Sequence, residues 1–311
     1  MKVLITGGMG FVGGHVADLY TSAGHEVTVV DACLPETGGA EELWAGTSHH
    51  AVIRARVEDV ENLPSLVRKA DLIVDAMGWT RHMLALKDPE NDLALNLSSH
   101  LCLIKSLPKD KQKKVIFLGS RGQYGNPKVE VIDESTPQVP EDVQGIHKVA
   151  AESHWRQISR RFGHSVVSLR FGNSYGPHQP MEGSDIGLLG GFIRIISADE
   201  NVELYGRGRS RPFIYVADVA RAVVACGEHS FEGFTAFNLA SEDVPLESAL
   251  DLLVKMLGKG GYSVVEFPQE EKTMDVGNAQ FSGEKFTKMF PDFETTLFAK
   301  GLADTLSFIT K

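Results

Sequence analysis

The sequence predicts an α/β fold, a doubly wound parallel sheet joined to a smaller C-terminal cap. Three observations support this fold class. Short β-branched runs alternate with helical patterns from Lys2 to Arg170, a glycine-rich turn connects the first run to the first helix, and the alternation stops after Arg170. Strands separated by helices are typical of βαβ units, whose parallel sheet is covered by helices on both faces.

The elements of the larger domain can be predicted in order. Strands are expected at KVLIT, EVTVVD, AVIRA, DLIVDA, KVIFLG and SVVSLR, because each is a short β-branched run bounded by turn residues. Helices are expected at FVGGHVADLYTSAG, at ENLPSLVRKA, over Asp92 to Ser106 and from about Gly145, where the pattern changes to a helical one. These helices would cover the two faces of the sheet.

The segment after Arg170 follows a looser pattern. NSYGPHQPMEGSDIG is expected to form a long loop, since Gly, Pro, Asn and Ser favour turns. Short helices and isolated strands follow at GLLGGFIRIISA, VELYG, VADVARAVVACGE, AFNLA and ESALDLLVKMLG. We therefore predict a larger domain over residues 1–172 and mainly a cap over 173–311, with a segment at about 210–240 that returns to the larger domain.

Bulk composition argues against several functional classes. A net charge of −10 and a pI of about 5.6 leave no general positive field for nucleic acid or an anionic membrane. The three cysteines, Cys33, Cys102 and Cys226, are odd in number, far apart and without the CxxC spacing of zinc or redox sites, which together favour a reducing compartment. No apolar run approaches the ~18 residues of a membrane span, and the chain begins with a strand. We expect a soluble cytoplasmic protein.

The turn TGGMGFVGG between the first strand and the first helix predicts a dinucleotide site. Gly7, Gly10 and Gly13 have GxxGxxG spacing, in which the glycines permit a tight turn, close approach of a pyrophosphate and packing of helix on strand. Asp31 ends the second strand, where a carboxylate can accept hydrogen bonds from a ribose and would repel a 2′-phosphate. The sequence therefore predicts a Rossmann domain over residues 1–172 that binds NAD rather than NADP.

Six motifs occur in an order that resembles the extended short-chain dehydrogenase/reductase family, which includes NAD-dependent nucleotide-sugar epimerases and dehydratases. They are TGGMGFVGG, DPENDLALN, KVIFLGSRGQYG, GIHKVAAE, LRFGNSYGP and YGRGRSRPFIYVADVA. The resemblance covers nearly the whole chain. It implies a Rossmann domain with a substrate-binding cap, a bound NAD and a nucleotide-sugar-like substrate.

The resemblance also implies roles for individual residues. Ser120 matches the family's serine or threonine after the fifth strand, and Lys148 matches the lysine that holds the nicotinamide ribose. Asn173 and Arg211 match residues expected to hold a nucleotide diphosphate, and His82 is expected on a substrate-facing loop. Further cofactor-binding positions implied in this way are Phe11, Val12, Val57, Ala76 and Asn96.

The family's catalytic tyrosine falls on Gln144, and a carboxamide has no usable pKa for acid–base catalysis. Several groups could carry the proton instead: Tyr124, which matches the tyrosine of the family's VYG pattern, His82, Lys148 if it is desolvated, or a water held by Gln144. His147 has a suitable pKa but projects about 100° around the helix from Lys148, so we expect it to pack or to face solvent.

Other departures from the family pattern narrow the reaction. Family 4,6-dehydratases carry Asp and Glu after the serine, where this chain has Arg121 and Gly122, so dehydration is disfavoured. Arg56 stands before Val57 where an acidic residue near the adenine is usual, which reopens NADP as an alternative cofactor. Gly119 replaces the commoner second hydroxyl before Ser120.

Two functions remain as hypotheses. The first is an NAD-dependent oxidoreductase or epimerase that acts on a nucleotide sugar or related alcohol. The second is an NAD-binding protein with little turnover, a redox sensor or assembly partner, because a fold without its base can still bind. No metal site is supported, and His49 and His50 are read as loop residues. By resemblance we also expect a homodimer, formed through the helix over Asp92 to Ser106 and the helix that carries Lys148.

Overall fold

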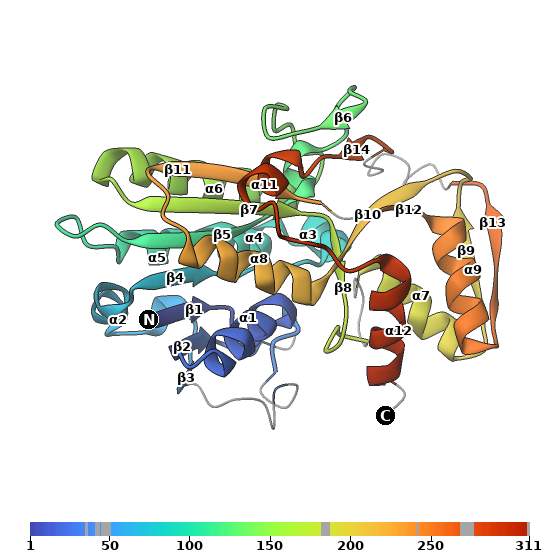
Figure 1. The fold of residues 1–311 in the computed structure, drawn as a ribbon, viewed down its shortest axis with the longest axis horizontal. Coiled ribbons are helices and arrows are strands. Elements are labelled where there is room, and N and C mark those ends of the chain that lie inside the picture. Colours follow the sequence, from blue (N-terminus) through green and yellow to red (C-terminus); the bar gives the residue numbers. More distant parts are fainter. Residues whose placement is uncertain are drawn as a thin grey trace.

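The computed structural model describes residues 1–34, 37–40, 44, 51–181, 187–240, 242–267 and 277–309. Within them, a seven-stranded parallel sheet has the strand order β11-β7-β5-β4-β1-β2-β3 (Figure 1). Its strands are β1 (Lys2–Thr6), β2 (Glu26–Asp31), β3 (Ala51–Arg54), β4 (Leu72–Asp75), β5 (Lys114–Ser120), β7 (Ser165–Phe171) and β11 (Phe234–Leu239). The predicted doubly wound parallel sheet is confirmed. The strand order reverses between β1 and β4, where ligands bind in such folds.

Helices cover both faces of this sheet. Helices α1 (Phe11–Ser22) and α8 (Val216–Glu228) lie on the near face in Figure 1, and a buried core joins them to the strands through side chains such as Val16, Tyr20 and Val219. On the other face a second core includes α2 (Leu63–Lys69), α5 (Ser99–Lys105) and α6 (Val143–Phe162), with Leu103 and Trp155 fully buried.

The local sequence determines where α6 begins and ends. The Asp142 side chain accepts a hydrogen bond from the Gly145 amide, which satisfies one unpaired donor of the first turn. Gly163 ends the helix in the left-handed region at a φ of 72°. Between these ends, α6 presents Gln144, Lys148 and Glu152 as buried residues at a spacing of four, so the three lie on one face of the helix.

A run of short helices follows β4. It consists of α3 (His82–Lys87), α4 (Pro89–Leu93), a single π turn η4 (Ala94–Ser98) and α5. The helix expected over Asp92 to Ser106 is therefore present, with a π turn in its middle. π turns within helices often occur at functional sites. The prediction that His82 lies on a loop is wrong, because α3 begins at this residue.

The smaller part lies beyond the carboxyl ends of the large sheet (Figure 1). Its elements are β8 (Asn173–Tyr175), α7 (Leu188–Ser197), β9 (Asn201–Tyr205), β10 (Ser210–Tyr215), β12 (Asp243–Pro245), α9 (Leu246–Leu257), β13 (Gly261–Val265) and α12 (Phe298–Ile309). They enclose a separate apolar core that includes Ile193, Leu250 and Leu302. A two-stranded sheet of β6 (Val131–Ile132) and β14 (Gln280–Phe281) and the helix α11 (Glu284–Met289) complete the fold.

No helix in the described part of the chain is both long enough and apolar enough to cross a membrane.

Candidate active site

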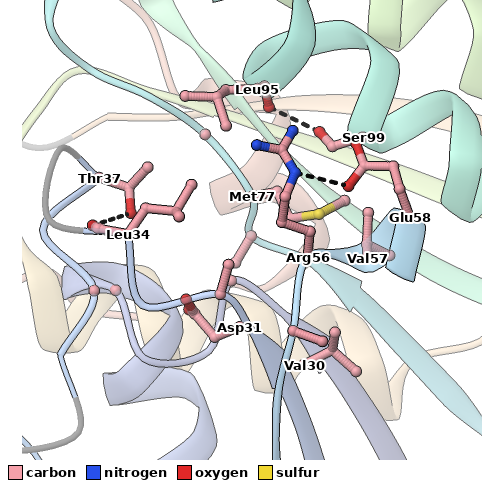
Figure 2. Close-up of a pocket in the computed structure, with 17 residues that line it drawn as sticks. Val30, Asp31, Leu34, Thr37, Arg56, Val57, Glu58, Met77, Leu95 and Ser99 are labelled. Carbon is pink, nitrogen blue, oxygen red and sulfur yellow. Dashed lines mark hydrogen bonds and ion pairs between the residues drawn. The ribbon is translucent and has the colours of Figure 1, made fainter. Parts of the chain in front are cut away.

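A cleft open to solvent lies at the carboxyl ends of β1 to β4, on the side where the strand order reverses (Figure 2). The segments that line it come from the turn after β1, the end of β2, the turn after β3, the loop after β4 and the helices that follow. The residues that line it include Gly7, Gly10, Asp31, Arg56, Val57, Ala76, Met77 and Gly78.

The glycine turn leaves no space for side chains at two of its positions. Gly7 has a φ of +76°, and a Cβ there would stand 2.7 Å from the Ala76 carbonyl oxygen; a Cβ on Gly13 would stand 2.1 Å from the Gly7 oxygen. Gly10 caps α1 without any side-chain hydrogen bond. The first-turn N–H groups of α1, which belong to Phe11, Val12 and Gly13, have no helical partner, so this end suits an anionic group such as a pyrophosphate.

Asp31 is held by two backbone amides at the edge of the cleft. Its Oδ2 accepts from the Met9 N–H and its Oδ1 from the Cys33 N–H, each at 2.8 Å. An ionised carboxylate can accept about four hydrogen bonds, so capacity for ribose hydroxyls remains. The negative charge would disfavour a 2′-phosphate at this position.

The far end of the cleft combines an apolar wall with a charged pair. Val57 is buried, and Arg56 Nε lies 3.6 Å from Glu58 Oε2. Figure 2 shows the Arg56 guanidinium extending past Met77 toward Ser99. The position where the family has an acidic residue is therefore occupied here by a cation with a carboxylate beside it.

Lys148 reaches the carboxyl ends of β4 and β5 from α6. Its Nζ donates to the Met77 carbonyl at 2.9 Å and to the Leu118 carbonyl at 3.2 Å. Burial lowers the pKa of Lys148 from 10.5 to about 8, although the charges of Asp75 and Asp92 oppose this shift. Lys148 is thus an amine that can change its protonation state near neutral pH.

Gln144 lies one turn before Lys148 and is 6% exposed. Its Nε2 donates a short hydrogen bond to the Trp79 carbonyl. Because a carbonyl oxygen can only accept, the amide nitrogen must face Trp79 and the Gln144 Oε1 must face the other way. Gln144 therefore anchors the loop after β4 to α6.

Asn96, in the π turn, holds the same loop from the other side. Its Oδ1 accepts from the Trp79 N–H at 2.8 Å, and its Nδ2 donates to the Trp79 carbonyl at 2.9 Å and to Asp92 Oδ2 at 2.8 Å. Asp92 Oδ1 in turn pairs with His147 Nδ1 at 2.5 Å. His147 thus contacts α4 rather than the cleft, the direction that its helical position predicts.

Ser120 ends β5 and caps the short helix η5 (Arg121–Tyr124). Its Oγ accepts from the Gly122 N–H at 3.0 Å, which leaves the hydroxyl proton for a ligand. Its backbone N–H donates to Gln123 Oε1 at 2.7 Å. Lys148 contacts the carbonyl of Leu118, two residues before Ser120, so the structure brings these two predicted site residues to the same strand end.

Tyr124 belongs to a buried network behind Ser120. Its hydroxyl donates to Asn238 Oδ1 at 2.6 Å and accepts from Arg170 Nη1 at 2.5 Å. Burial raises the pKa of Tyr124, although Arg170 opposes this. A fully buried phenol with both hydrogen-bonding roles occupied is poorly suited to exchange a proton with a substrate.

His82, Asn173 and Arg211 were also predicted as site residues, and none of the three lines the cleft. His82 Nδ1 pairs with Asp142 Oδ2 at 2.9 Å, at the start of α6. Burial alone would raise the pKa of Asp142, but hydrogen bonds from His82 and the Gly145 amide lower it overall. Asn173 and Arg211 stand on the adjacent strands β8 and β10, and Arg211 Nη1 donates to the Ser210 and Gly277 carbonyls.

Sequence reasoning missed several residues that shape this site. Trp79 holds Gln144 and Asn96 through its backbone, which carries no signal in the sequence. Gln123, Asp92 and Glu152 act by holding other residues, and only Gln123 left a trace, as a polar residue where the family pattern has valine. Among the described residues no group of three His, Cys, Asp or Glu could hold a metal ion; His49 and His50 lie outside those residues.

Comparisons with known proteins identify the family of the chain. A sequence model of the NAD dependent epimerase/dehydratase family matches residues 3–240. The putative UDP-glucose 4-epimerase of Methanocaldococcus jannaschii is 23% identical over 292 residues, which cover 91% of this chain and 92% of the relative.

Solved structures extend the likeness to the whole chain. The UDP-N-acetylglucosamine 4-epimerase of Methanobrevibacter ruminantium, in complex with UDP-N-acetylmuramic acid, aligns with a TM-score of 0.89 at 22% identity, covering 99% of this chain and 98% of that one. The UDP-glucose 4-epimerase of Thermus thermophilus, in complex with NAD, aligns with a TM-score of 0.85 at 25% identity, covering 100% and 99%.

Proposed function

The chain belongs to the NAD dependent epimerase/dehydratase family, and on that premise we propose that it oxidises, or oxidises and re-reduces, one carbinol carbon of a nucleotide sugar. The observation that carries the proposal is the position of a buried lysine with a lowered pKa beside an NAD-compatible cleft. Relatives named as UDP-glucose 4-epimerases support a UDP-sugar as the first substrate to test.

The residues of the cleft fit NAD. Phe11, Val12 and Gly13 would bind the pyrophosphate through their N–H groups, and Asp31 would accept a ribose hydroxyl. Val57 and Ala76 would line the adenine side, and Lys148, near Asn96, would lie at the nicotinamide end. When bound, NAD would supply an acceptor for the hydride of the carbinol carbon and, once reduced, a donor to return it.

Ser120 and Lys148 would handle the hydroxyl of the substrate. The Ser120 hydroxyl donates to the carbinol oxygen and orients it. A neutral Lys148 amine has two N–H groups and one lone pair. The two N–H groups donate to the Met77 and Leu118 carbonyls, so the lone pair is left to accept the hydroxyl proton. Nζ lies only 3.2 Å from where a Cβ on Gly78 would be, and Gly78 lines the cleft.

We infer that Lys148 takes the hydroxyl proton as the carbon is oxidised and returns it on reduction. Gln144 cannot ionise, and its amide is engaged by the Trp79 carbonyl.

Asn173 and Arg211 would hold the diphosphate of the substrate, Arg211 as the cation. His82 would stand at the substrate side of the rim, and Tyr124 would support the wall behind Ser120. Arg121 and Gly122 supply no acid–base pair, which disfavours dehydration.

The test of this function is a product assay. We expect purified protein with NAD⁺ to convert at least one UDP-sugar of a panel to its epimer or keto product, detected by mass spectrometry and NMR. Lys148→Arg keeps the cation but cannot give up a proton, and it should lower kcat by about 10²- to 10⁴-fold. Gln144→Tyr restores a phenol and should give Lys148→Arg back part of its activity. Turnover that survives Lys148→Arg unchanged would exclude Lys148 as the proton carrier.

A second function is favoured by the engagement of Gln144 with a backbone carbonyl, which is compatible with a protein that binds NAD and turns over little. In that case NAD would bind with high affinity, while no sugar of the panel would be converted and Lys148→Arg would leave binding of NAD nearly unchanged. Calorimetric titration with NAD, run beside the product assay, distinguishes the two functions.

We also propose that the protein is a homodimer. The helices α3, α4 and α6 lie against one another and expose large apolar side chains, among them Leu86, Leu93 and Ile146, which are 59%, 43% and 52% exposed. On helices that contact one another, such exposed residues would contribute to an apolar interaction surface.

A further inference from the structure

Two residues beside Ser120 depart together from the SSxxVYG pattern of the family. Gly119 stands where the pattern has a hydroxyl, and Gln123 stands where it has valine. The two positions meet in space, because a Cβ on Gly119 would lie 2.6 Å from Gln123 Oε1. It would also lie 3.1 Å from Ser168 Oγ and from Arg170 Cγ. The Gln123 side chain therefore occupies space that a residue with a side chain at 119 would need.

Gln123 uses both ends of its amide. Its Oε1 accepts from the Ser120 backbone N–H at 2.7 Å, and its Nε2 donates to Glu152 Oε2 at 2.9 Å. An N–H can only donate and a carboxylate can only accept, so the orientation of the amide is fixed by its partners. The side chain is fully buried, where a lost hydrogen bond is costly.

Glu152 connects this amide to the helix that carries the proposed proton carrier. It lies one turn after Lys148 on α6, and its carboxylate also accepts from Ser168 Oγ at 2.8 Å and Arg170 Nε at 2.8 Å. Burial would raise the pKa of Glu152, but Arg170, Gln123 and Ser168 lower it overall. The carboxylate is therefore a fixed anionic anchor between β7 and α6.

We propose that Gln123 is a positioning residue, which sets the place of Ser120 relative to α6 and Lys148, and that Gly119 is the small partner that makes room for it. This inference rests on the proposed function, in which Ser120 and Lys148 act on one hydroxyl group. A displacement of about 1 Å between such groups can cost about 100-fold in rate. Gln123 itself need not touch substrate or cofactor.

A double-mutant cycle tests the pairing. Gln123→Val removes both hydrogen bonds, and Gly119→Ser introduces a side chain into occupied space, so we expect each to lower kcat by about 10- to 100-fold with KM changed less than about threefold. The double variant has the family arrangement and should recover to within about fivefold of the parent. Losses that multiply in the double variant would overturn the proposal.

The pH profile separates positioning from general destabilisation. In Gln123→Glu the new carboxyl must be protonated to donate to Glu152, and the neighbouring carboxylate raises its pKa. We expect kcat of this variant to fall as pH rises from 6 to 8, relative to the parent. The matched control, Gln123→Met, should show a loss that does not depend on pH. Equal pH profiles for Gln123→Glu and Gln123→Met would contradict the role.

Hydrogen exchange provides a readout that needs no turnover. The Ser120 amide should exchange slowly in the parent and at least tenfold faster in Gln123→Met, while the amides of α1 keep their rates. If the parent converts no sugar, the proposed function fails but this contact is still tested by exchange. If the parent is active and exchange at Ser120 is unchanged in Gln123→Met, the inference about Gln123 fails alone.

Discussion

Gln144 and Lys148 occupy the positions where the family resemblance implies a catalytic tyrosine and a lysine that holds the nicotinamide ribose. The Gln144 amide makes a structural contact, a hydrogen bond to the Trp79 carbonyl, but it cannot ionise. Lys148 is buried with two carbonyl acceptors and no carboxylate within salt-bridge distance in the described part of the chain. Its low pKa follows from this burial. Proton transfer is therefore better supported at the amine than at the amide.

The buried ammonium should make stability depend on pH. Below pH 8 Lys148 is protonated in the folded and the unfolded chain, so the folded state bears the full cost of burying the charge. Between about pH 8 and 10.5 the unfolded chain binds the proton and the folded one does not, so stability rises with pH. Relative to Lys148→Met, the parent should gain about 2 to 3 kcal/mol of unfolding free energy between pH 7 and 10. Urea unfolding of both proteins measures it.

Comparison of two proteins removes the other titrating groups from this measurement. Burial also lowers the pKa of Lys113 to about 8, but Lys113 is present in both proteins and cancels in the difference. A difference between parent and Lys148→Met that stays constant from pH 7 to 10 would mean that Lys148 titrates normally in the folded protein.

The family resemblance implied that Ser120 and Lys148 share one site, and sequence periodicity predicted the strand and the helix that carry them. The contact of Gln144 could not be predicted in the same way. Its partner is the backbone carbonyl of Trp79, and the conformation of a loop after a strand depends on what packs around it rather than on its own residues. Gly119 was noted as a departure from the family pattern and Gln123 was missed, because only the fold brings the two positions together.

At the scale of elements, the loop after β4 is held between two helical segments. Asn96 in the π turn makes three hydrogen bonds to Trp79 and Asp92, and α6 adds Gln144 and the His147 to Asp92 pair. A π turn inserts one extra residue into a helix and redirects the side chains around it. Here the turn contains the buried amide of Asn96, which faces the loop that lines the cleft.

Removing that amide should loosen the loop. Asn96→Ala deletes three buried hydrogen bonds, so that the Trp79 backbone and Asp92 Oδ2 lose the Asn96 side chain as a partner, and we expect a loss of about 2 to 4 kcal/mol in unfolding free energy. NAD affinity should also fall, because Met77 and Gly78 belong to the same loop. Chemical denaturation and calorimetric titration measure the two effects.

Asn91→Ala on α4 is the matched control for Asn96→Ala. In the described part of the chain the Asn91 side chain makes no hydrogen bond, and its backbone N–H donates to Asp88. It should change stability by less than about 0.5 kcal/mol. Equal effects of the two substitutions would argue against the anchoring role of Asn96.

Some helices and turns could be predicted from the sequence and others could not. The glycine turn and α1 could be predicted because Gly7 and Gly13 are required by contacts as close as 2.1 Å. His82 was expected on a loop but begins α3, a helix of six residues whose cap residue, Arg81, makes no side-chain cap hydrogen bond. Without a capping residue, a helix this short leaves little trace in a sequence.

At the scale of the whole molecule, the order of the strands in the sheet determines where the cleft lies. The strand order reverses between β1 and β4, and the cap lies beyond the carboxyl ends of the same sheet (Figure 1). Within residues 210–240, α8 packs on the sheet and β11 forms its edge beside β7. The register of the cap strands could not be predicted, because β8, β10 and β12 are short and pair with segments far away in the chain.

The proposed homodimer is the prediction that belongs to this scale. Leu86→Glu combined with Ile146→Glu places two charges on the apolar surface of α3 and α6, where burial of an unpaired charge is unfavourable. We expect the parent to sediment as a dimer and the double variant as a monomer with unchanged circular dichroism. Leu297→Glu, at an exposed leucine next to α12, is the matched control and should remain dimeric. A parent that sediments as a monomer at micromolar concentration would contradict the proposal, and dimers that persist in the double variant would place the interface on another surface.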